Sequence, residues 1–441
     1  MSARRPIHLL IVFGIVAGVV LRLAWPDDIH YLGDEAWTFR HVEDAREGGS
    51  WAALGMPSSR GVKNAGMSVW VFIVLGMISR AATPPGLTRA VAVLAIIAHV
   101  AAFFVPLRLL KDEEEKKQWT WAIILTLTNP ILIFLERKIW AQSVLPIFMI
   151  GLVIAWMRRD TRPGSLVWGL LGAIIGQIHM AGFFFAPALA LWTKLFGDKT
   201  PDAQVAKKAR WSMWILGSAI GAAPAIPWLL YLARDRPPAN ASEWWLRFRL
   251  EFYQYFFSDP TSMSGEYILG KDILTVMKYP IVANCPTYLV GVADGVLAVA
   301  SFVIALRAVM GLWERRRDWK SILKGGGTDT GVLIASTLAG MGVLMTLPSI
   351  SIHRHYMLAT FPIQYVWTAR AALRKPGGEK WLAVLFAGGL VVSAGILSYV
   401  HATGENAEMG KTYATQQRLG IAPEDAKPKP PAPTNPSGGA H

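Results

Sequence analysis

The chain has 441 residues, of which 53% are hydrophobic and 17% charged, and its formal net charge is +14. Soluble domains carry about 25% charged residues, so this composition argues against a soluble globular protein. The Lys and Arg residues stand in short connectors between long apolar runs, where they set membrane orientation, and we therefore expect no nucleic-acid partner. The single cysteine, Cys285, excludes an internal disulfide framework and a cysteine-based metal cluster.

The first apolar run, 7–25, is interpreted as a retained membrane span. It is followed by Trp25-Pro26-Asp27-Asp28, which does not resemble the small-residue site at which a signal peptide is cleaved. Two arginines precede the run, and this places the N-terminus on the cytoplasmic side.

The remaining apolar runs predict an all-α, polytopic integral membrane protein. Helical spans need about 17 to 25 apolar residues, whereas barrel strands would appear as alternating segments of about half that length. We expect about eleven spans in a transmembrane domain, 1–401, with two long outer loops, 26–86 and 233–287, and a disordered tail, 402–441. The spans are predicted near 7–25, 87–110, 119–135, 139–157, 164–181, 182–196, 211–232, 288–310, 328–348, 356–370 and 381–401.

The positive charges support this order of spans. The inner connectors are all rich in Lys or Arg, as the positive-inside rule requires: 111–117, 158–162, 194–210, 315–320 and 374–380. The apolar stretch Met67–Ser79 is too short to span, and a span there would move every later connector to the opposite side. We therefore expect an interfacial helix in the first outer loop.

The second outer loop contains an aromatic stripe, Glu243–Phe257. Trp244, Phe248, Phe252 and Tyr255 recur at helical spacing, with charged residues between them. This pattern is typical of a helix in the headgroup layer, and a substrate-gripping element is the alternative.

Ionisable residues from distant parts of the chain gather on the outer side. Alone, each has a structural explanation, because a terminal Arg or Lys can snorkel and a lone His can pack in a core. Together they offer a general base and a cradle for an anionic group. They are Asp34 and Glu35 after the first span, Arg137 and Lys138, His179, and His353, Arg354 and His355.

Transfer of a sugar from a lipid phosphate would use these residue types. A carboxylate removes the proton of the acceptor hydroxyl, and Arg, Lys and protonated His stabilise the departing phosphate. The lipid tail stays in hydrocarbon, so such a site should lie where helices meet a wet loop.

Five outer-face motifs carry a family resemblance: Tyr31–Trp37, Lys63–Met67, Glu136–Pro146, Gln177–His179 and Arg354–Tyr356. In their order and sidedness they resemble the GT-C membrane glycosyltransferases. The branches they resemble are the protein O-mannosyltransferase-like and the lipid A aminoarabinose-transferase-like enzymes.

The resemblance implies a GT-C fold and an inverting transfer from a polyprenyl-phosphate-linked sugar to a lipid, glycan or protein hydroxyl. It places the site on the periplasmic side of the bacterial inner membrane. The residues it implies are Asp34 as base with Glu35 beside it; Arg137, Lys138, Lys63 and Arg354 at the donor phosphate; and His179, His355, Tyr356 and Trp140 at the substrate.

Two departures from the family pattern bear on these roles. The Pro-Pro pair that often follows the Lys or His is replaced by Asn64-Ala65, which affects the placement of Lys63. The second acidic residue found in some members has no counterpart in 138–143, so we do not predict a divalent metal at Asp34 and Glu35.

Three other functions compete with this hypothesis. A flippase or other transporter of lipid-linked sugars would place ionisable residues near the membrane midplane, whereas the predicted spans carry few charges and no internal repeat. A polymerase or ligase of surface glycans would not need the carboxylate pair after the first span. A non-catalytic scaffold that binds lipid-linked glycans would keep the motifs without turnover.

Overall fold

The computed structural model describes residues 5–57, 62–197, 208–234, 250–347 and 352–423. In these ranges the chain is helical except for short two-stranded hairpins. Five helical stretches are long and apolar enough to cross a membrane, and further apolar helices are shorter. The chain is an all-α polytopic membrane protein, as its sequence predicts.

Each predicted span coincides with a helix or with a run of helical segments. They are α1 (Arg5–Leu23); α4 (Pro84–Ala102) with η1 (Val105–Leu109); α5 (Glu113–Thr128) with α6 (Pro130–Leu135); η2 (Ala141–Val144) with α7 (Leu145–Met157); α8 (Arg162–Ile178); α9 (Gly182–Trp192) with η3 (Thr193–Gly197); α10 (Trp211–Ala222), η4 (Ala223–Ala225) and α11 (Ile226–Arg234); α15 (Leu289–Glu314); α17 (Asp329–Ala335), η8 (Ser336–Met341) and α18 (Gly342–Thr346); η9 (Arg354–Thr360) with α19 (Ile363–Leu373); and α20 (Gly378–Thr403).

The span predicted at 119–135 is broken at Asn129. Pro130 has no N–H to continue the helix, and the Asn129 side chain accepts a hydrogen bond from the Leu132 N–H at 3.3 Å. The break starts a separate helix, α6, and the chain after α6 contributes residues to the candidate site.

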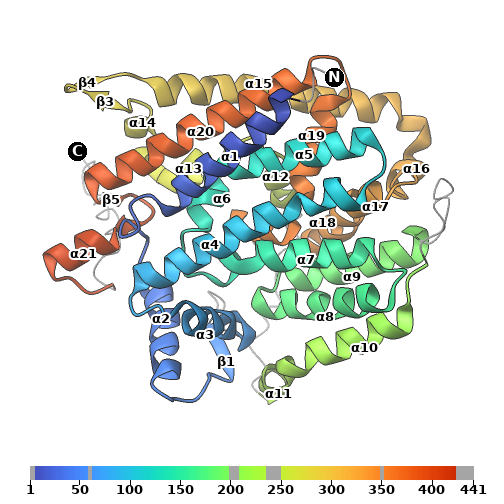
Figure 1. Cartoon of the computed structure of the whole chain (residues 1–441), viewed down its shortest axis with the longest axis horizontal. Coiled ribbons are helices and arrows are strands. Elements are labelled where there is room, and N and C mark those ends of the chain that lie inside the picture. The colour runs from blue at the N-terminus through green and yellow to red at the C-terminus, as the bar shows by residue number, and fades with distance from the viewer. Residues whose placement is uncertain (1–4, 58–61, 198–207, 235–249, 348–351, 424–441) are drawn as a thin grey trace, which may run out of the picture.

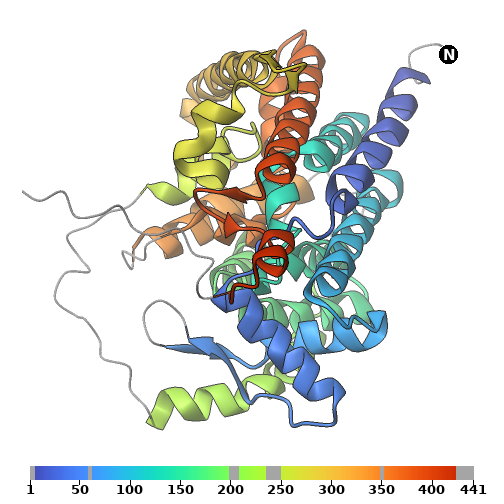
Figure 2. The same cartoon turned by 90° about the vertical axis from the view of Figure 1, so that its left-hand side faces the viewer.

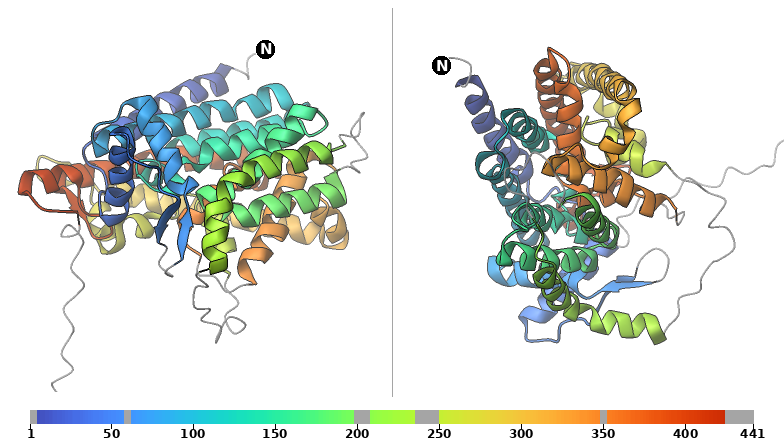
Figure 3. Two further views of the ribbon diagram at one scale, coloured as in Figure 1. Left: turned by 90° about the horizontal axis from the view of Figure 1, so that it is seen from below. Right: turned by 90° about the vertical axis from the view of Figure 1, so that its right-hand side faces the viewer.

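The helices run roughly side by side, and the outer loops gather at one end of the bundle. Figure 1 shows α2, α3, β1 and α21 on the left, with the connector helix α16 (Trp319–Leu323) at the opposite end. In the view onto the loop end, α2 and α21 lie next to each other (Figure 2), and further views show the bundle from below and from its other end (Figure 3).

The first outer loop forms α2 (Gly33–Arg46), the hairpin of β1 (Leu54–Pro57) and β2 (Lys63–Ala65), and α3 (Met67–Ser79). The bounds of α3 are those of the stretch predicted to be too short to span. One face of α3 is buried against the neighbouring helices through Val69, Phe72 and Ile73. Its packing fixes the position of α2.

The second outer loop contains α12 (Glu251–Ser258), α13 (Gly265–Leu269), η6 (Gly270–Asp272), α14 (Ile273–Val276), and strands β3 (Ile281–Val282) and β4 (Cys285–Pro286). Residues 243–249 of the aromatic stripe lie outside the described residues. In α12, Phe252 and Phe256 are buried, and Phe256 packs on Trp367 of α19 with ring centroids 5.8 Å apart. Within α12, therefore, the aromatic residues Phe252 and Phe256 pack against protein.

The tail predicted to be disordered from 402 onward is folded through residue 420. It forms a hairpin of β5 (Glu405–Asn406) and β6 (Gly410–Lys411), followed by α21 (Tyr413–Leu419). The N–H of Tyr413 donates to the Ile29 carbonyl at 3.0 Å, and the Gln416 amide donates to the Tyr31 carbonyl at 2.7 Å. The end of the chain is thereby attached to the first outer loop.

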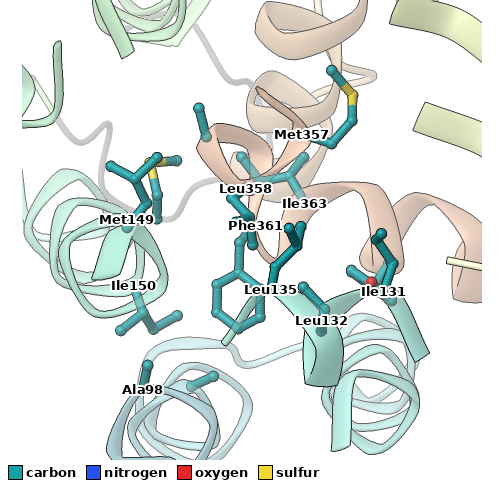
Figure 4. Packing of buried hydrophobic residues seen from close by; sticks show 14 of the residues in the cluster. Ala98, Ile131, Leu132, Leu135, Met149, Ile150, Met357, Leu358, Phe361 and Ile363 are labelled. Atoms are coloured by element: carbon teal, nitrogen blue, oxygen red, sulfur yellow. The ribbon is translucent and has the colours of Figure 1, made fainter. Parts of the chain in front are cut away.

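The apolar core lies where α4, α6, α7 and η9 meet. Figure 4 shows Phe361 between Leu132 and Leu135 of α6 and Ile150 of α7. All four side chains are buried. This packing supports the segments that carry the polar residues of the outer face.

Candidate active site

Two adjoining cavities open at the loop end of the bundle. The first, of about 250 Å³, is called here the lysine cavity because Lys138 lines it, together with Asp34, Glu35 and Glu408. The second, of about 310 Å³, is called the histidine cavity and is lined by Asp34 and mainly by neutral polar and aromatic side chains. Asp34 and Trp140 line both cavities, so they stand where the cavities meet.

The start of α2 positions the two acidic residues differently. Glu35 is fully buried, accepts a hydrogen bond from the Leu32 N–H at 3.1 Å and shares a hydrogen bond with the His30 imidazole. Burial alone would raise the pKa of Glu35, but His30 and Lys138 outweigh it and hold the pKa below its usual value. Glu35 is therefore an anchored carboxylate that caps its own helix.

Asp34 is the accessible member of the pair. Successive side chains of a helix point about 100° apart, so Asp34 faces the cavities while Glu35 faces the interior. Its position in the first turn of α2 is favourable for an anion, because the helix N-terminus carries partial positive charge.

Lys138 is a buried cation held between two aromatic rings. Its Nζ lies 3.5 Å from the Trp140 ring centroid and 4.6 Å from that of Phe134. Burial lowers the pKa of Lys138 to about 8, although the charges of Asp34 and nearby carboxylates oppose this shift. Near neutral pH the lysine is thus mostly charged and directed at the carboxylate side of the cavity.

The histidine cavity is polar, and its lining includes the imidazoles of His179, His353 and His355. Burial lowers the pKa of His355 well below its usual value. The rings of His179 and Tyr356 lie 4.8 Å apart, and His355 shares a hydrogen bond of 3.1 Å with the Tyr267 hydroxyl. His179 and His355, which the family resemblance implies at the substrate, thus line one cavity and offer hydrogen bonds and ring faces there.

Arg137 points away from the cavities, although the sequence makes it the leading phosphate ligand. Its guanidinium donates to the carbonyls of Leu21, Arg22, Ala24 and Trp25 at 2.6 to 3.2 Å. These carbonyls belong to the end of α1, where the helix cannot satisfy them itself. Arg137 thus caps α1.

Arg354 and Lys63 also lie outside both cavities. Arg354 pairs with the carboxylate of Asp259 and stacks 4.7 Å from the Tyr255 ring centroid, so it attaches η9 to α12. Lys63 is an exposed residue of β2 whose carbonyl accepts a hydrogen bond from the Trp228 indole at 2.9 Å. The adjacent Asn64 lines the histidine cavity instead.

Three residues of the lysine cavity were not foreseen. His30 directly precedes the Tyr31–Trp37 motif, so its position was a usable signal. Tyr267 and Glu408 come from segments that carry no motif, and Glu408 stands in the tail expected to be disordered. Among the residues that the structure describes, no group of three or more His, Cys, Asp or Glu side chains is arranged to hold a metal ion.

The contribution of the tail can be measured by truncation. Deleting 404–441 removes Glu408 and the α21 contacts that hold the first loop, and we expect amide hydrogen exchange in 29–46 to become faster. Deleting 424–441 alone spares these contacts and should leave the exchange unchanged. Equal exchange in both truncated proteins would show that the tail does not position the loop.

No family model matches the chain, and no curated protein matches it. Among solved structures it is similar to ArnT from Cupriavidus metallidurans bound to undecaprenyl phosphate, with a TM-score of 0.44 and 11% identity over 91% of this chain and 79% of that one. It is also similar to the Archaeoglobus fulgidus oligosaccharyltransferase in the apo form, with a TM-score of 0.43 and 11% identity over 89% of this chain and 56% of the other, about half its length. Both proteins are members of the GT-C superfamily, which the outer-face motifs of this chain resemble.

Proposed function

We propose that this chain is an inverting glycosyltransferase that moves a sugar from a polyprenyl-phosphate donor to an acceptor hydroxyl at the outer membrane face. The observation that carries the proposal is the position of Asp34, at the junction of a cavity with a buried lysine and a cavity with neutral polar walls. Such a transfer needs a carboxylate as base, a cation for the leaving phosphate, and a pocket that can bind a carbohydrate.

In the proposed reaction, Asp34 accepts the proton of the acceptor hydroxyl while its oxygen attacks the anomeric carbon of the donor sugar. The bond between that carbon and the phosphate oxygen breaks, and polyprenyl phosphate leaves with an additional negative charge. Lys138 stabilises this charge in a site with little water. Attack opposite the leaving group inverts the anomeric configuration.

The histidine cavity has the composition of a sugar site. Asn64 and Gln142 bring amides, and His179 and His355 bring imidazoles that can donate or accept hydrogen bonds from sugar hydroxyls. Trp140 offers an aromatic face where the cavities join. Since carbohydrates combine many hydroxyls with apolar C–H faces, these walls suit the transferred sugar or the acceptor.

A transporter would bind and release the same donor without breaking it. Arg22, His99 and Glu136 form a charged group inside the spans, a placement that transporters also use. These three residues bond to one another and line neither outer cavity. We therefore assign them a structural role and keep glycosyl transfer as the function.

Purified protein in detergent separates the two functions, because no second compartment is present. With a polyprenyl-phosphate sugar and candidate acceptors, we expect release of polyprenyl phosphate and a glycosylated product of inverted configuration. Donor that stays intact with every acceptor class would support the transporter or a scaffold. Mass spectrometry of envelope lipids and glycans from a deletion strain would identify the sugar and the acceptor.

Lys138 gives the proposal a pH signature. The lysine is charged below its pKa of about 8 and neutral above it, so kcat/KM for the donor should fall as pH rises through that value. In Lys138→Arg the cation persists, and the fall should move to higher pH. Lys138→Gln should lower kcat/KM at pH 7 by roughly ten- to a hundredfold, the loss of one charge-assisted hydrogen bond. Identical pH profiles for wild type and Lys138→Arg would show that Lys138 does not act on the donor phosphate.

A further inference from the structure

A third cavity lies at the opposite end of the bundle and is not used by the proposed reaction. It has a volume of about 590 Å³ and is enclosed by α5, α15, α16, α17 with η8, and α19. Three arginines line it, Arg315, Arg370 and Arg374, and we call it the arginine cavity. It stands among the Lys- and Arg-rich connectors, on the face that the sequence places toward the cytoplasm.

The charge of the arginine cavity is strongly one-sided. Its lining contains three arginines and one acidic residue, Glu114. Arg315 makes one long contact, 4.0 Å to Asp318. In the described part of the chain Arg370 and Arg374 form no direct ion pair or hydrogen bond, and Glu115 and Glu314 attract them only from a longer distance. A partly enclosed cavity with this excess of positive charge attracts an anion.

Gly311 shows how Arg374 reaches the cavity. A Cβ at this position of α15 would stand 1.9 Å from Nη1 of Arg374, so the guanidinium occupies the space that the missing side chain leaves. The turn after α19 is held independently, since Arg307 donates to the carbonyls of Ala372 and Lys375 at 2.6 and 3.1 Å. Arg374 is therefore not required to hold this turn.

The cavity also contains an unused polar acceptor. Gln118 of α5 lines it, and its Oε1 is buried without a hydrogen-bond partner among the described residues. A buried unpaired acceptor is costly and is expected to be satisfied by a bound molecule or by water. A ligand with an anionic group and a hydroxyl donor would satisfy the arginines and Gln118 together.

Part of the cavity lining consists of apolar side chains that are also exposed on the molecular surface. Leu312 of α15 is 53% exposed and Leu323 of α16 is 39% exposed, and both also line the cavity. Around them Met310 and Trp313 are exposed on the same helix, α15. These side chains would contact acyl chains, so the anion that fits this cavity carries a hydrophobic tail.

We propose that the arginine cavity binds the phosphate of an anionic phospholipid of the inner leaflet, with a headgroup hydroxyl donating to Gln118. Basic cavities between transmembrane helices on the cytoplasmic side are suited to such headgroups. The phosphate lies between Arg370 and Arg374, and the acyl chains leave over Leu312 and Leu323. Phosphatidylglycerol has the required charge and hydroxyls and is the probe of choice.

The test uses the full chain, delipidated in a non-ionic detergent and titrated with phosphatidylglycerol or phosphatidylcholine under native mass spectrometry. We expect phosphatidylglycerol to bind at least about tenfold more tightly. The Arg370→Gln/Arg374→Gln variant should lose roughly tenfold or more of this affinity, through two charged contacts. The matched variant Arg316→Gln/Arg317→Gln removes the same charge from the same connector region outside the cavity and should bind as wild type does.

Gly311→Ala provides a second test that keeps every charge. Its methyl group displaces only the flexible end of Arg374, so the fold should persist while phosphatidylglycerol affinity falls. Equal binding of the two lipids, or equal loss in the matched control, would overturn the proposal. Competition by inorganic phosphate at the same concentration as the lipid would instead identify a site for soluble anions.

Discussion

Replacing Asp34 with asparagine is expected to lower the rate of sugar transfer by roughly 10²- to 10⁴-fold, the usual contribution of a general base. Asn has nearly the same shape as Asp but cannot accept the proton of the acceptor hydroxyl. Since Lys138 and the histidine cavity are unchanged, the donor should still bind. Single-turnover measurement with a labelled donor separates this loss in the chemical step from a loss in binding.

The matched control is Asp44→Asn, which makes the same change on the exposed side of the same helix, away from both cavities. It should transfer sugar at the wild-type rate. Glu35→Gln is expected to act differently, by weakening the buried hydrogen bond with His30 and lowering the yield of folded protein more than the rate per molecule. A fully active Asp34→Asn enzyme would show that Asp34 is not the general base.

The sequence could predict that distant segments meet at one end of the bundle. The loop after α1, the turn after α8 and the segment before α19 were each expected on the same side of the membrane, and Asp34, His179 and His355 from these segments line one cavity. The assignment was possible because apolar length and connector charge determine which end of a span faces which side.

The sequence alone could not predict the direction in which each side chain points. Arg137 and Lys138 are neighbours and equally basic, yet Arg137 caps α1 while Lys138 enters the lysine cavity. Whether Arg137 or Lys138 enters the cavity depends on the position of the carbonyls at the end of α1. Tertiary packing determines that position. Arg354 was misplaced for the same reason, since its partner Asp259 is distant in the chain.

The folded tail carried local signals that its overall composition obscured. Thr412 caps α21 by accepting a hydrogen bond from the Thr415 N–H, and Gly410 and Gly420 have the positive φ values that a hairpin and a helix end require. The Pro- and Lys-rich composition that indicates disorder belongs to 424–441, which lies outside the described residues. Because the composition of the whole tail was considered together, the predicted disordered segment also included the residues that form β5, β6 and α21.

Arg22, His99 and Glu136 form a buried polar group between the helices. All three side chains are almost completely buried, and they join α1, α4 and the end of α6. Arg22 Nε donates to the Glu136 carboxylate at 2.7 Å, and His99 Nε2 lies 3.0 Å from the same carboxylate. Glu136 also stands two residues before Lys138, so it holds the start of the segment that enters the lysine cavity.

Glu136→Leu is expected to cost about 3–5 kcal/mol of unfolding free energy, because it leaves the Arg22 charge buried without its partner. Unfolding in mixed micelles, followed by circular dichroism, measures this loss. The double variant Arg22→Met/Glu136→Leu removes both charges and should recover part of the stability, because no charge is left buried without its partner. The recovery is incomplete because Arg22 also donates to the Leu127 carbonyl at 2.8 Å. If the single and double variants were equally stable, the attraction between Arg22 and Glu136 would not hold these helices together, and Lys138 would need another support.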